Sequence, residues 1–108
     1  MLRNLSPNGK EAEQHLTGGK GIRVRIIDAQ QQLMAITAEE CGELTQVCMK
    51  VLRRGDIDEE LRNKLLEEAG DVLCMLELMH QYDIFSWQEL EDRSDYKKQK
   101  LEKWSDLL

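Results

Sequence analysis

The sequence predicts an all-α protein built from two long antiparallel helices and a C-terminal helix. Charged residues make up 33% of the 108 residues and only one residue is proline, a composition that favours helices over strands. Apolar residues recur with helical spacing, at about 100° per residue, through two long segments. Helix-capping residues and a glycine mark where these segments begin and end.

The first helix is predicted from about Ile27 to Arg54. Its apolar stripe consists of Ala29, Leu33, Ile36, Leu44, Val47 and Val51. The segment Thr37-Ala38-Glu39-Glu40 has the form of a capping box. The stripe nevertheless passes through this segment without a change of phase, so we predict one continuous helix. Arg53 and Arg54 in the last turn, followed by Gly55, are typical of a helix C-terminus.

The second helix is predicted to begin after Asp56 or Asp58, either of which can cap it, and to run to about Gln81. Its apolar stripe consists of Leu61, Leu65, Val72, Met75, Leu76 and Met79. The segment Ser86-Trp87-Gln88-Glu89 is a stronger capping box and opens a third helix, which ends near Trp104. Four methionines, Met34, Met49, Met75 and Met79, are predicted to fill the core.

Residues 1–21 are predicted to form a flexible N-terminal segment, and residues 22–108 a helical domain. The glycines at 18–21 lack the spacing and the Lys-Ser/Thr ending of a phosphate-binding loop, so a flexible connection is the simpler interpretation. Residues Ile22–Ile26 alternate apolar and basic side chains. That pattern fits either a short extended segment or the start of the first helix.

Size and charge limit the partners that this chain can have. A two-helix core is marginal alone, so we expect a homo-oligomer, a dimer or tetramer, with four-helix-bundle cores. The net charge of −6 argues against a polynucleotide partner. No apolar run is long enough for a membrane helix, and no signal-peptide core follows Met1. We therefore expect a cytoplasmic protein whose three cysteines, Cys41, Cys48 and Cys74, are free thiols.

Two acidic pairs interrupt the apolar stripes. Glu40 falls in the middle of the first stripe, and Glu43 lies at its edge, three residues later. Glu68 and Asp71 repeat this arrangement on the second stripe. Two helices that bury these stripes against each other would bring four carboxylates into one cleft. Burying ionised carboxylates is unfavourable unless a cation meets them, and a hard cation such as Mg²⁺ prefers carboxylate oxygens.

The motif Glu39-Glu40-x-x-Glu43, followed further along the chain by Glu68-x-x-Asp71, resembles the signature of the MazG-like, all-α nucleoside triphosphate pyrophosphohydrolases. The similarity covers roughly residues 26–108 and is closest to short single-domain members from phages and bacteria. It implies that water attacks the α-phosphorus of a nucleoside or deoxynucleoside triphosphate, giving the monophosphate and pyrophosphate. Larger members have a loop with proline, cysteine and tryptophan before the first helix, and this chain lacks it, which leaves the preferred base open.

The resemblance also implies roles for single residues. The metal ligands are Glu40, Glu43, Glu68 and Asp71, with Mg²⁺ as the cofactor and Mn²⁺ able to replace it. Glu39 matches the first glutamate of the motif and would orient or deprotonate the attacking water, although helical geometry turns it further from the stripe than Glu43.

Four further residues are candidates for substrate binding. Lys50 lies two helical turns beyond Glu43 on the same edge, where it can reach a β- or γ-phosphate, and Arg54 follows on that face. Lys97 in the third helix is an alternative phosphate contact. Gln31 is a candidate for reading a base edge. The lysines fit an ordinary solvated helix face equally well.

Two other functions remain open from the sequence. Phosphoribosyl-ATP hydrolysis is the nearest enzymatic alternative, because histidine-biosynthesis enzymes share the architecture that the resemblance implies. The other is a non-enzymatic helical adaptor, in which the acids form salt bridges with Lys64, Arg53 or a partner subunit. The Glu77-x-x-His80 spacing also occurs in di-iron bundles, but such a site needs a second copy of the motif.

Overall fold

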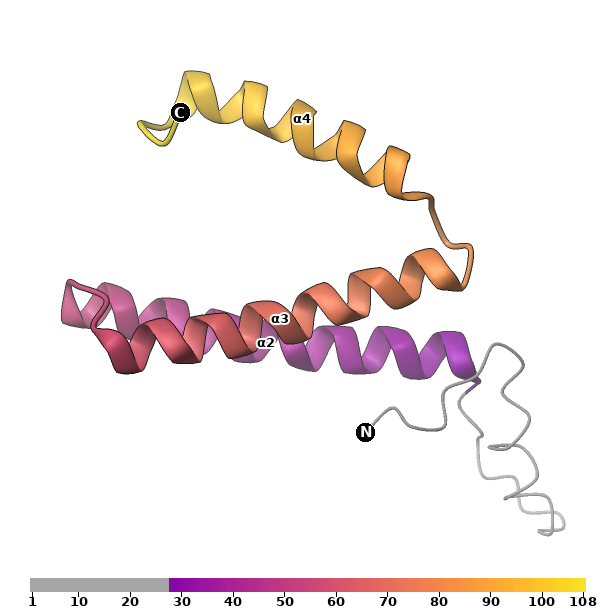
Figure 1. Ribbon diagram of the computed structural model, residues 1–108, viewed down its shortest axis with the longest axis horizontal. Helices are drawn as coiled ribbons and strands as arrows, with labels where there is room; N and C mark the ends of the chain where they lie inside the picture. Colours follow the sequence, from indigo (N-terminus) through magenta and orange to yellow (C-terminus); the bar gives the residue numbers. More distant parts are fainter. Residues whose placement is uncertain (1–27) are drawn as a thin grey trace, which may run out of the picture. The chain divides into compact units, whose positions relative to one another are not determined.

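The structure is a computed structural model that describes residues 28–108, and these residues form three helices. The helices are α2 (Ala29–Arg54), α3 (Glu59–Gln81) and α4 (Trp87–Trp104). The all-α prediction is thus confirmed for this part of the chain, which contains no strand. Figure 1 shows α2 and α3 side by side and antiparallel. The predictions of a flexible segment at 1–21 and of an extended or helical segment at 22–26 lie outside the described residues.

The start of α2 is fixed by a reciprocal capping box. The Asp28 carboxylate accepts a hydrogen bond from the Gln31 N–H at 2.8 Å, and the Gln31 side-chain Oε1 accepts one from the Asp28 N–H at 3.1 Å. The helix then continues through Thr37, whose hydroxyl donates to the Leu33 carbonyl at 2.7 Å instead of capping a new helix. The prediction of one continuous helix is therefore confirmed.

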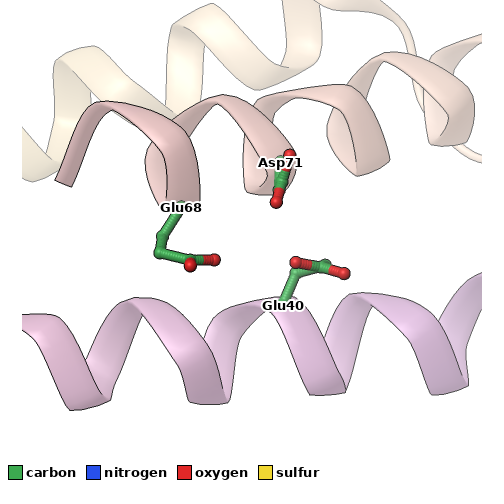
Figure 2. Close-up of side chains that lie close together, drawn as sticks. All are labelled: Glu40, Glu68 and Asp71. Atoms are coloured by element: carbon green, nitrogen blue, oxygen red, sulfur yellow. The ribbon is translucent and has the colours of Figure 1, made fainter. Parts of the chain in front are cut away.

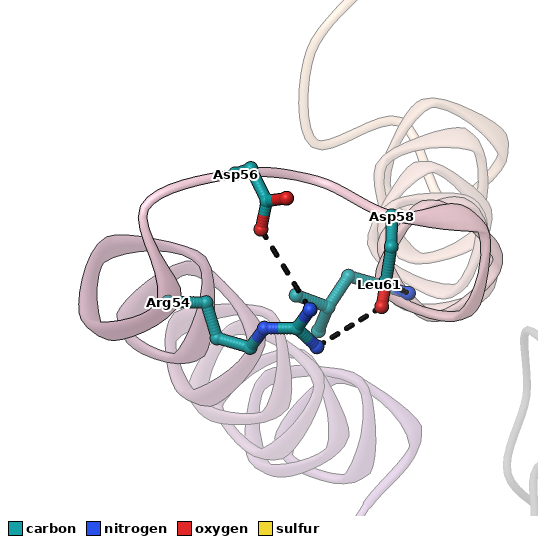
Figure 3. A network of polar contacts seen from close by, with 4 residues as sticks. All are labelled: Arg54, Asp56, Asp58 and Leu61. Carbon is teal, nitrogen blue, oxygen red and sulfur yellow. Dashed lines mark hydrogen bonds and ion pairs between the residues drawn. The ribbon is translucent and has the colours of Figure 1, made fainter.

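The turn between α2 and α3 is held by a small polar network, drawn in Figure 3. The Asp58 carboxylate accepts a hydrogen bond from the Leu61 N–H at 2.8 Å, so Asp58, rather than Asp56, caps α3. Arg54 forms ion pairs with Asp58 at 3.0 Å and with Asp56 at 3.7 Å. The Leu61 N–H and the Arg54 guanidinium lower the pKa of Asp58. Both helix ends are therefore fixed by the residues of the turn itself.

A glycine inside α2 and the glycine that follows the helix are expected to respond in opposite ways to replacement by alanine. Gly55 ends the helix in the left-handed conformation, with φ of 89°. Because a Cβ is strained there, Gly55→Ala is expected to lower the free energy of unfolding by about 1 kcal/mol. Gly42 lies inside the helix with open space where a Cβ would be. Gly42→Ala is therefore expected to raise the free energy of unfolding by about 0.5–1 kcal/mol. Urea unfolding of both variants measures these changes, and equal destabilisation would contradict this account.

The core between α2 and α3 follows the predicted stripes. Among the described residues up to Leu78, the buried apolar side chains are Ala29, Leu33, Val47, Leu61 and Met75, and all five occupy stripe positions. Met79, the first residue of the second unit, is also buried and also occupies a stripe position. Met34 and Met49 do not belong to this core, contrary to the prediction, because they are 45% and 46% exposed. They lie on the face of α2 that points away from α3.

The described residues divide into two compact units between Leu78 and Met79. In the second unit, the predicted capping box opens α4: the Ser86 hydroxyl accepts from the Glu89 N–H at 3.1 Å, and the Glu89 carboxylate accepts from the Ser86 N–H at 2.9 Å. His80 stacks on Trp87 with ring centroids 5.6 Å apart. Of the helices described, none is long and apolar enough to cross a membrane.

Candidate metal centre

Three carboxylates meet between α2 and α3. Glu40 of α2 and Glu68 and Asp71 of α3 each offer an oxygen atom, and these atoms all lie within 4.8 Å of one another. Figure 2 shows Glu40 pointing toward α3, and Glu68 and Asp71 pointing toward α2. The two helices therefore bring together acids that are far apart in the sequence, in the way the sequence predicted for these three.

Glu43 of α2 is a fourth acid beside these three, at the exposed side of the group. Its side chain is exposed, but it lies close enough to Glu68 that its negative charge, after burial the largest cause, raises the pKa of Glu68. Glu40 makes the equivalent contact with Asp71. The antiparallel helices thus pair Glu40 with Asp71 and Glu43 with Glu68. We call these four residues the acid cluster.

Burial and mutual repulsion both act on the acid cluster. Glu68 is buried, with 6% of its surface exposed, and Glu40 is half-buried. Burial is the main cause that raises the pKa of each, and the negative charge of Glu43 is the next. The charges of Asp71 and Glu39 raise the pKa of Glu40 further. The site therefore favours any species that supplies positive charge.

Two oxygen atoms of the cluster are buried without a hydrogen-bond partner in the described part of the chain: Oε1 of Glu40 and Oε1 of Glu68. Ionised carboxylates can only accept hydrogen bonds, so neighbouring pairs such as Glu40 and Asp71 cannot satisfy each other. A proton or a cation has to lie between them. A site that offers only carboxylate oxygens fits the donor preference of Mg²⁺.

Lys64 is the cation that lies beside Glu68, and it is one of the partners that the adaptor hypothesis named for these acids. Its ammonium nitrogen lies 4.0 Å from Oε2 of Glu68 and 3.8 Å from an oxygen of Glu67. The positive charge of Lys64 lowers the pKa of Glu68, but its effect is smaller than each of the effects that raise this pKa. One ammonium group beside four carboxylates leaves the cluster negative. The spacing of Lys64, four residues before Glu68, places the two side chains on the same face of α3.

Salt bridges alone therefore account for only a small part of the acid cluster. Among residues 28–108, Lys64 is the only cation that forms an ion pair with a member of the cluster. The adaptor hypothesis also named Arg53 as a partner, and no ion pair joins Arg53 to these acids. The remaining negative charge needs another source of compensation.

The predicted catalytic residue Glu39 lies next to the acid cluster. It is exposed and is not one of the three acids whose oxygens converge, yet its charge contributes to the raised pKa of Glu40. This position, at the exposed border of the cluster, leaves the Glu39 carboxylate accessible to water.

The four predicted substrate contacts are spread along the chain. Lys50 is exposed and lies about 10 Å beyond Glu43 along the axis of α2, on the same edge. Arg54 is held by Asp56 and Asp58 in the turn, about 21 Å along the axis from Glu40. The Gln31 carboxamide is part of the capping box at the start of α2. Lys97 belongs to the second unit, where it lines a shallow depression on α4 with Lys100, Leu101 and Trp104. Arg54 and Gln31 make contacts at the two ends of α2, and Lys97 belongs to the second unit. Lys50 is therefore the candidate that lies on the same edge of α2 as Glu43.

No protein-family model, curated protein or solved structure matches this chain. The resemblance to MazG-like enzymes therefore remains a prediction from the two acidic motifs. What the structure adds is the meeting of these motifs between two helices, with two buried oxygens that lack partners. Such an arrangement can bind a hard divalent cation and, through it, the oxygens of a phosphate chain.

Proposed function

We propose that this protein is a Mg²⁺-dependent hydrolase that converts nucleoside or deoxynucleoside triphosphates to the monophosphate and pyrophosphate. The main support is the acid cluster, in which the buried Glu68 and the half-buried Glu40 converge with Asp71 and have too little positive charge to balance them. An acidic protein that handles a polyphosphate needs cations between its own charge and that of the substrate. The motif resemblance supplies the particular reaction.

Glu40, Glu43, Glu68 and Asp71 would hold Mg²⁺, and Mn²⁺ can replace it because it accepts the same oxygen ligands. When bound, the ion supplies positive charge to the phosphate oxygens and makes water in its hydration shell more acidic. The unpartnered oxygens of Glu40 and Glu68 support this assignment, because each gains a favourable contact when a cation binds.

The remaining steps are assigned to residues around the cluster. Glu39 orients the attacking water and accepts its proton as the water oxygen bonds to the α-phosphorus. The bond from the α-phosphorus to the bridging oxygen breaks, and pyrophosphate leaves with that oxygen. Lys50 is in the best position to hold the β- or γ-phosphate, because it lies on the edge of α2 that also presents Glu43. Arg54, Gln31 and Lys97 stay as weaker candidates for substrate contacts.

A screen for pyrophosphate release tests this proposal. The purified protein is offered the common ribo- and deoxyribonucleoside triphosphates and phosphoribosyl-ATP, each with Mg²⁺, with Mn²⁺ or with a chelator. We expect metal-dependent pyrophosphate release from at least one nucleoside triphosphate. Release from phosphoribosyl-ATP alone would favour the histidine-biosynthesis reaction. The absence of release from every substrate, by folded protein with metal present, would favour the adaptor function.

A further inference from the structure

Lys64 lies beside two carboxylates of α3 and is too far from either for a direct hydrogen bond. Its ammonium nitrogen is 3.8 Å from Oε1 of Glu67 and 4.0 Å from Oε2 of Glu68. Hydrogen bonds between an ammonium group and a carboxylate are about 2.7–2.9 Å long. The Lys64 side chain is also 48% exposed. The ammonium group is therefore held by charge and keeps part of its water shell, so a stronger cation can displace it.

The Glu68 carboxylate has two oxygens in different surroundings. Oε2 forms the ion pair with Lys64, whereas Oε1 is buried without a hydrogen-bond partner in the described part of the chain. The oxygen that pairs with Lys64 is thus not the one that lacks a partner. Lys64 adds positive charge near the acid cluster and still leaves the buried oxygen of Glu68 unsatisfied. A cation that reaches this oxygen has a contact to gain that Lys64 does not supply.

Lys64 also lies on the side of α3 on which the acid cluster is exposed. At about 100° per residue, Lys64 and Asp71 differ by only about 20° around the helix axis, and both are displaced from Glu68 in the same sense. Arg62 is displaced from Glu68 by about 120° in the opposite sense. Arg62 forms no ion pair among residues 28–108. The two cations at the start of α3 therefore differ in whether they face the acids.

The charge of Lys64 has opposite effects with and without a metal ion. Without one, it partly compensates acids that repel one another, and it lowers the pKa of Glu68 while Glu43 raises it. With a divalent cation in the acid cluster, Lys64 and the cation are two positive charges beside one carboxylate. A unit charge within one helical turn of a divalent ion changes the dissociation constant about three- to tenfold in water-like surroundings with salt. Lys64 is therefore placed to compete with the metal.

We propose that Lys64 is an exchangeable counter-charge of the acid cluster, which pairs with Glu68 in the metal-free protein, is displaced when Mg²⁺ binds, and thereby weakens the binding of Mg²⁺. This rests on the proposed function, because it takes Mg²⁺ as the ion that the acid cluster binds. Lys64 reduces the repulsion between the acids while the metal is absent. The same charge limits how tightly the site holds the ion.

Titration with Mg²⁺ in the absence of nucleotide tests this role. Isothermal titration calorimetry at low ionic strength measures the dissociation constant of Mg²⁺, and circular dichroism checks that each variant is folded. We expect Lys64→Gln to bind Mg²⁺ about three- to tenfold more tightly than the wild type, because the competing charge is gone. Lys64→Met keeps most of the aliphatic stem and should show the same gain. Lys64→Arg keeps the charge and should stay within about twofold of the wild type.

Arg62→Gln is the matched control. It removes the same charge from α3, two residues earlier, at a position that does not face the acids. Its dissociation constant for Mg²⁺ should stay within about twofold of the wild type. If Arg62→Gln tightens Mg²⁺ binding as much as Lys64→Gln does, the net charge of the chain explains the effect and the counter-charge role of Lys64 is wrong.

Melting temperatures read the same coupling from the other direction, because the effect of Lys64 on Mg²⁺ binding equals the effect of Mg²⁺ on the contribution of Lys64. With a chelator, Lys64→Gln should melt at a lower temperature than the wild type. With saturating Mg²⁺ this difference should shrink. A purely structural role of Lys64, such as packing of its aliphatic stem, predicts the same difference in both conditions.

The outcomes separate this proposal from the proposed function. If the wild type binds Mg²⁺ and Lys64→Gln binds it equally or more weakly, the counter-charge role is wrong while the metal centre stands. A difference in melting temperature that Mg²⁺ leaves unchanged has the same meaning. If the wild type binds no Mg²⁺, the proposed function fails and the role of Lys64 fails with it.

Discussion

Replacement of Glu68 by glutamine is expected to reduce Mg²⁺-dependent pyrophosphate release at least about 100-fold, because the variant loses a charged ligand at the centre of the acid cluster. The fold should persist, since glutamine has nearly the same size and the substitution removes a negative charge that Glu43 and Glu67 repel. Initial rates at saturating nucleotide and Mg²⁺ measure the effect, with circular dichroism as the test of folding.

Glu67→Gln is the matched control for this experiment. Glu67 is the adjacent residue on α3, but its side chain is 62% exposed and is not one of the three convergent acids. The control removes the same charge from the same turn of the helix and should keep most of the activity. If Glu68→Gln keeps wild-type activity, the acid cluster is not the catalytic site. If both variants lose activity equally, net charge rather than metal ligation explains the loss.

Without Mg²⁺, the protein is expected to become more stable as the pH falls from neutral toward the ordinary glutamate pKa of 4.5. The pKa values of Glu40 and Glu68 are raised in the folded chain above their ordinary value of 4.5. The folded state therefore binds more protons than the unfolded state in this range. The stabilisation from protonation is complete below the unfolded pKa and is lost as the pH rises through the raised pKa. Asp58 has the opposite shift, from 3.8 downward, so its contribution is lost only at lower pH.

Mg²⁺ should reverse this pH dependence. A metal binds the deprotonated carboxylates, so its stabilising effect grows as the pH rises. Melting temperatures measured across this pH range, with Mg²⁺ and with a chelator, should therefore diverge toward high pH. The Glu68→Gln variant should show a much smaller divergence. The adaptor hypothesis predicts instead that Mg²⁺ leaves the melting temperature unchanged at every pH, and that result would remove the support for a metal centre.

Much of the fold follows from local sequence signals. The stripe that contains Leu33 predicted which side of α2 is buried, and the Ser86 capping box predicted the start of α4, because helical periodicity and capping depend on residues three or four positions apart. The same reasoning identified Glu68 as an acid on a buried stripe. It failed for Met34 and Met49, because residue type alone does not say which face of a helix has a partner.

The sequence by itself determined the three helices, the buried stripes, and the positions of Glu40 and Glu68 upon them. Only the tertiary structure decided that Glu40 meets Asp71, that Glu43 meets Glu68, and that Asp58 rather than Asp56 caps α3. The physical reason is that periodicity places a residue around one helix axis, whereas the alignment of two helices along their axes depends on the turn and the packing between them. The raised pKa values of Glu40 and Glu68 arise from that alignment, because burial and the nearby acids exist only once the helices are paired.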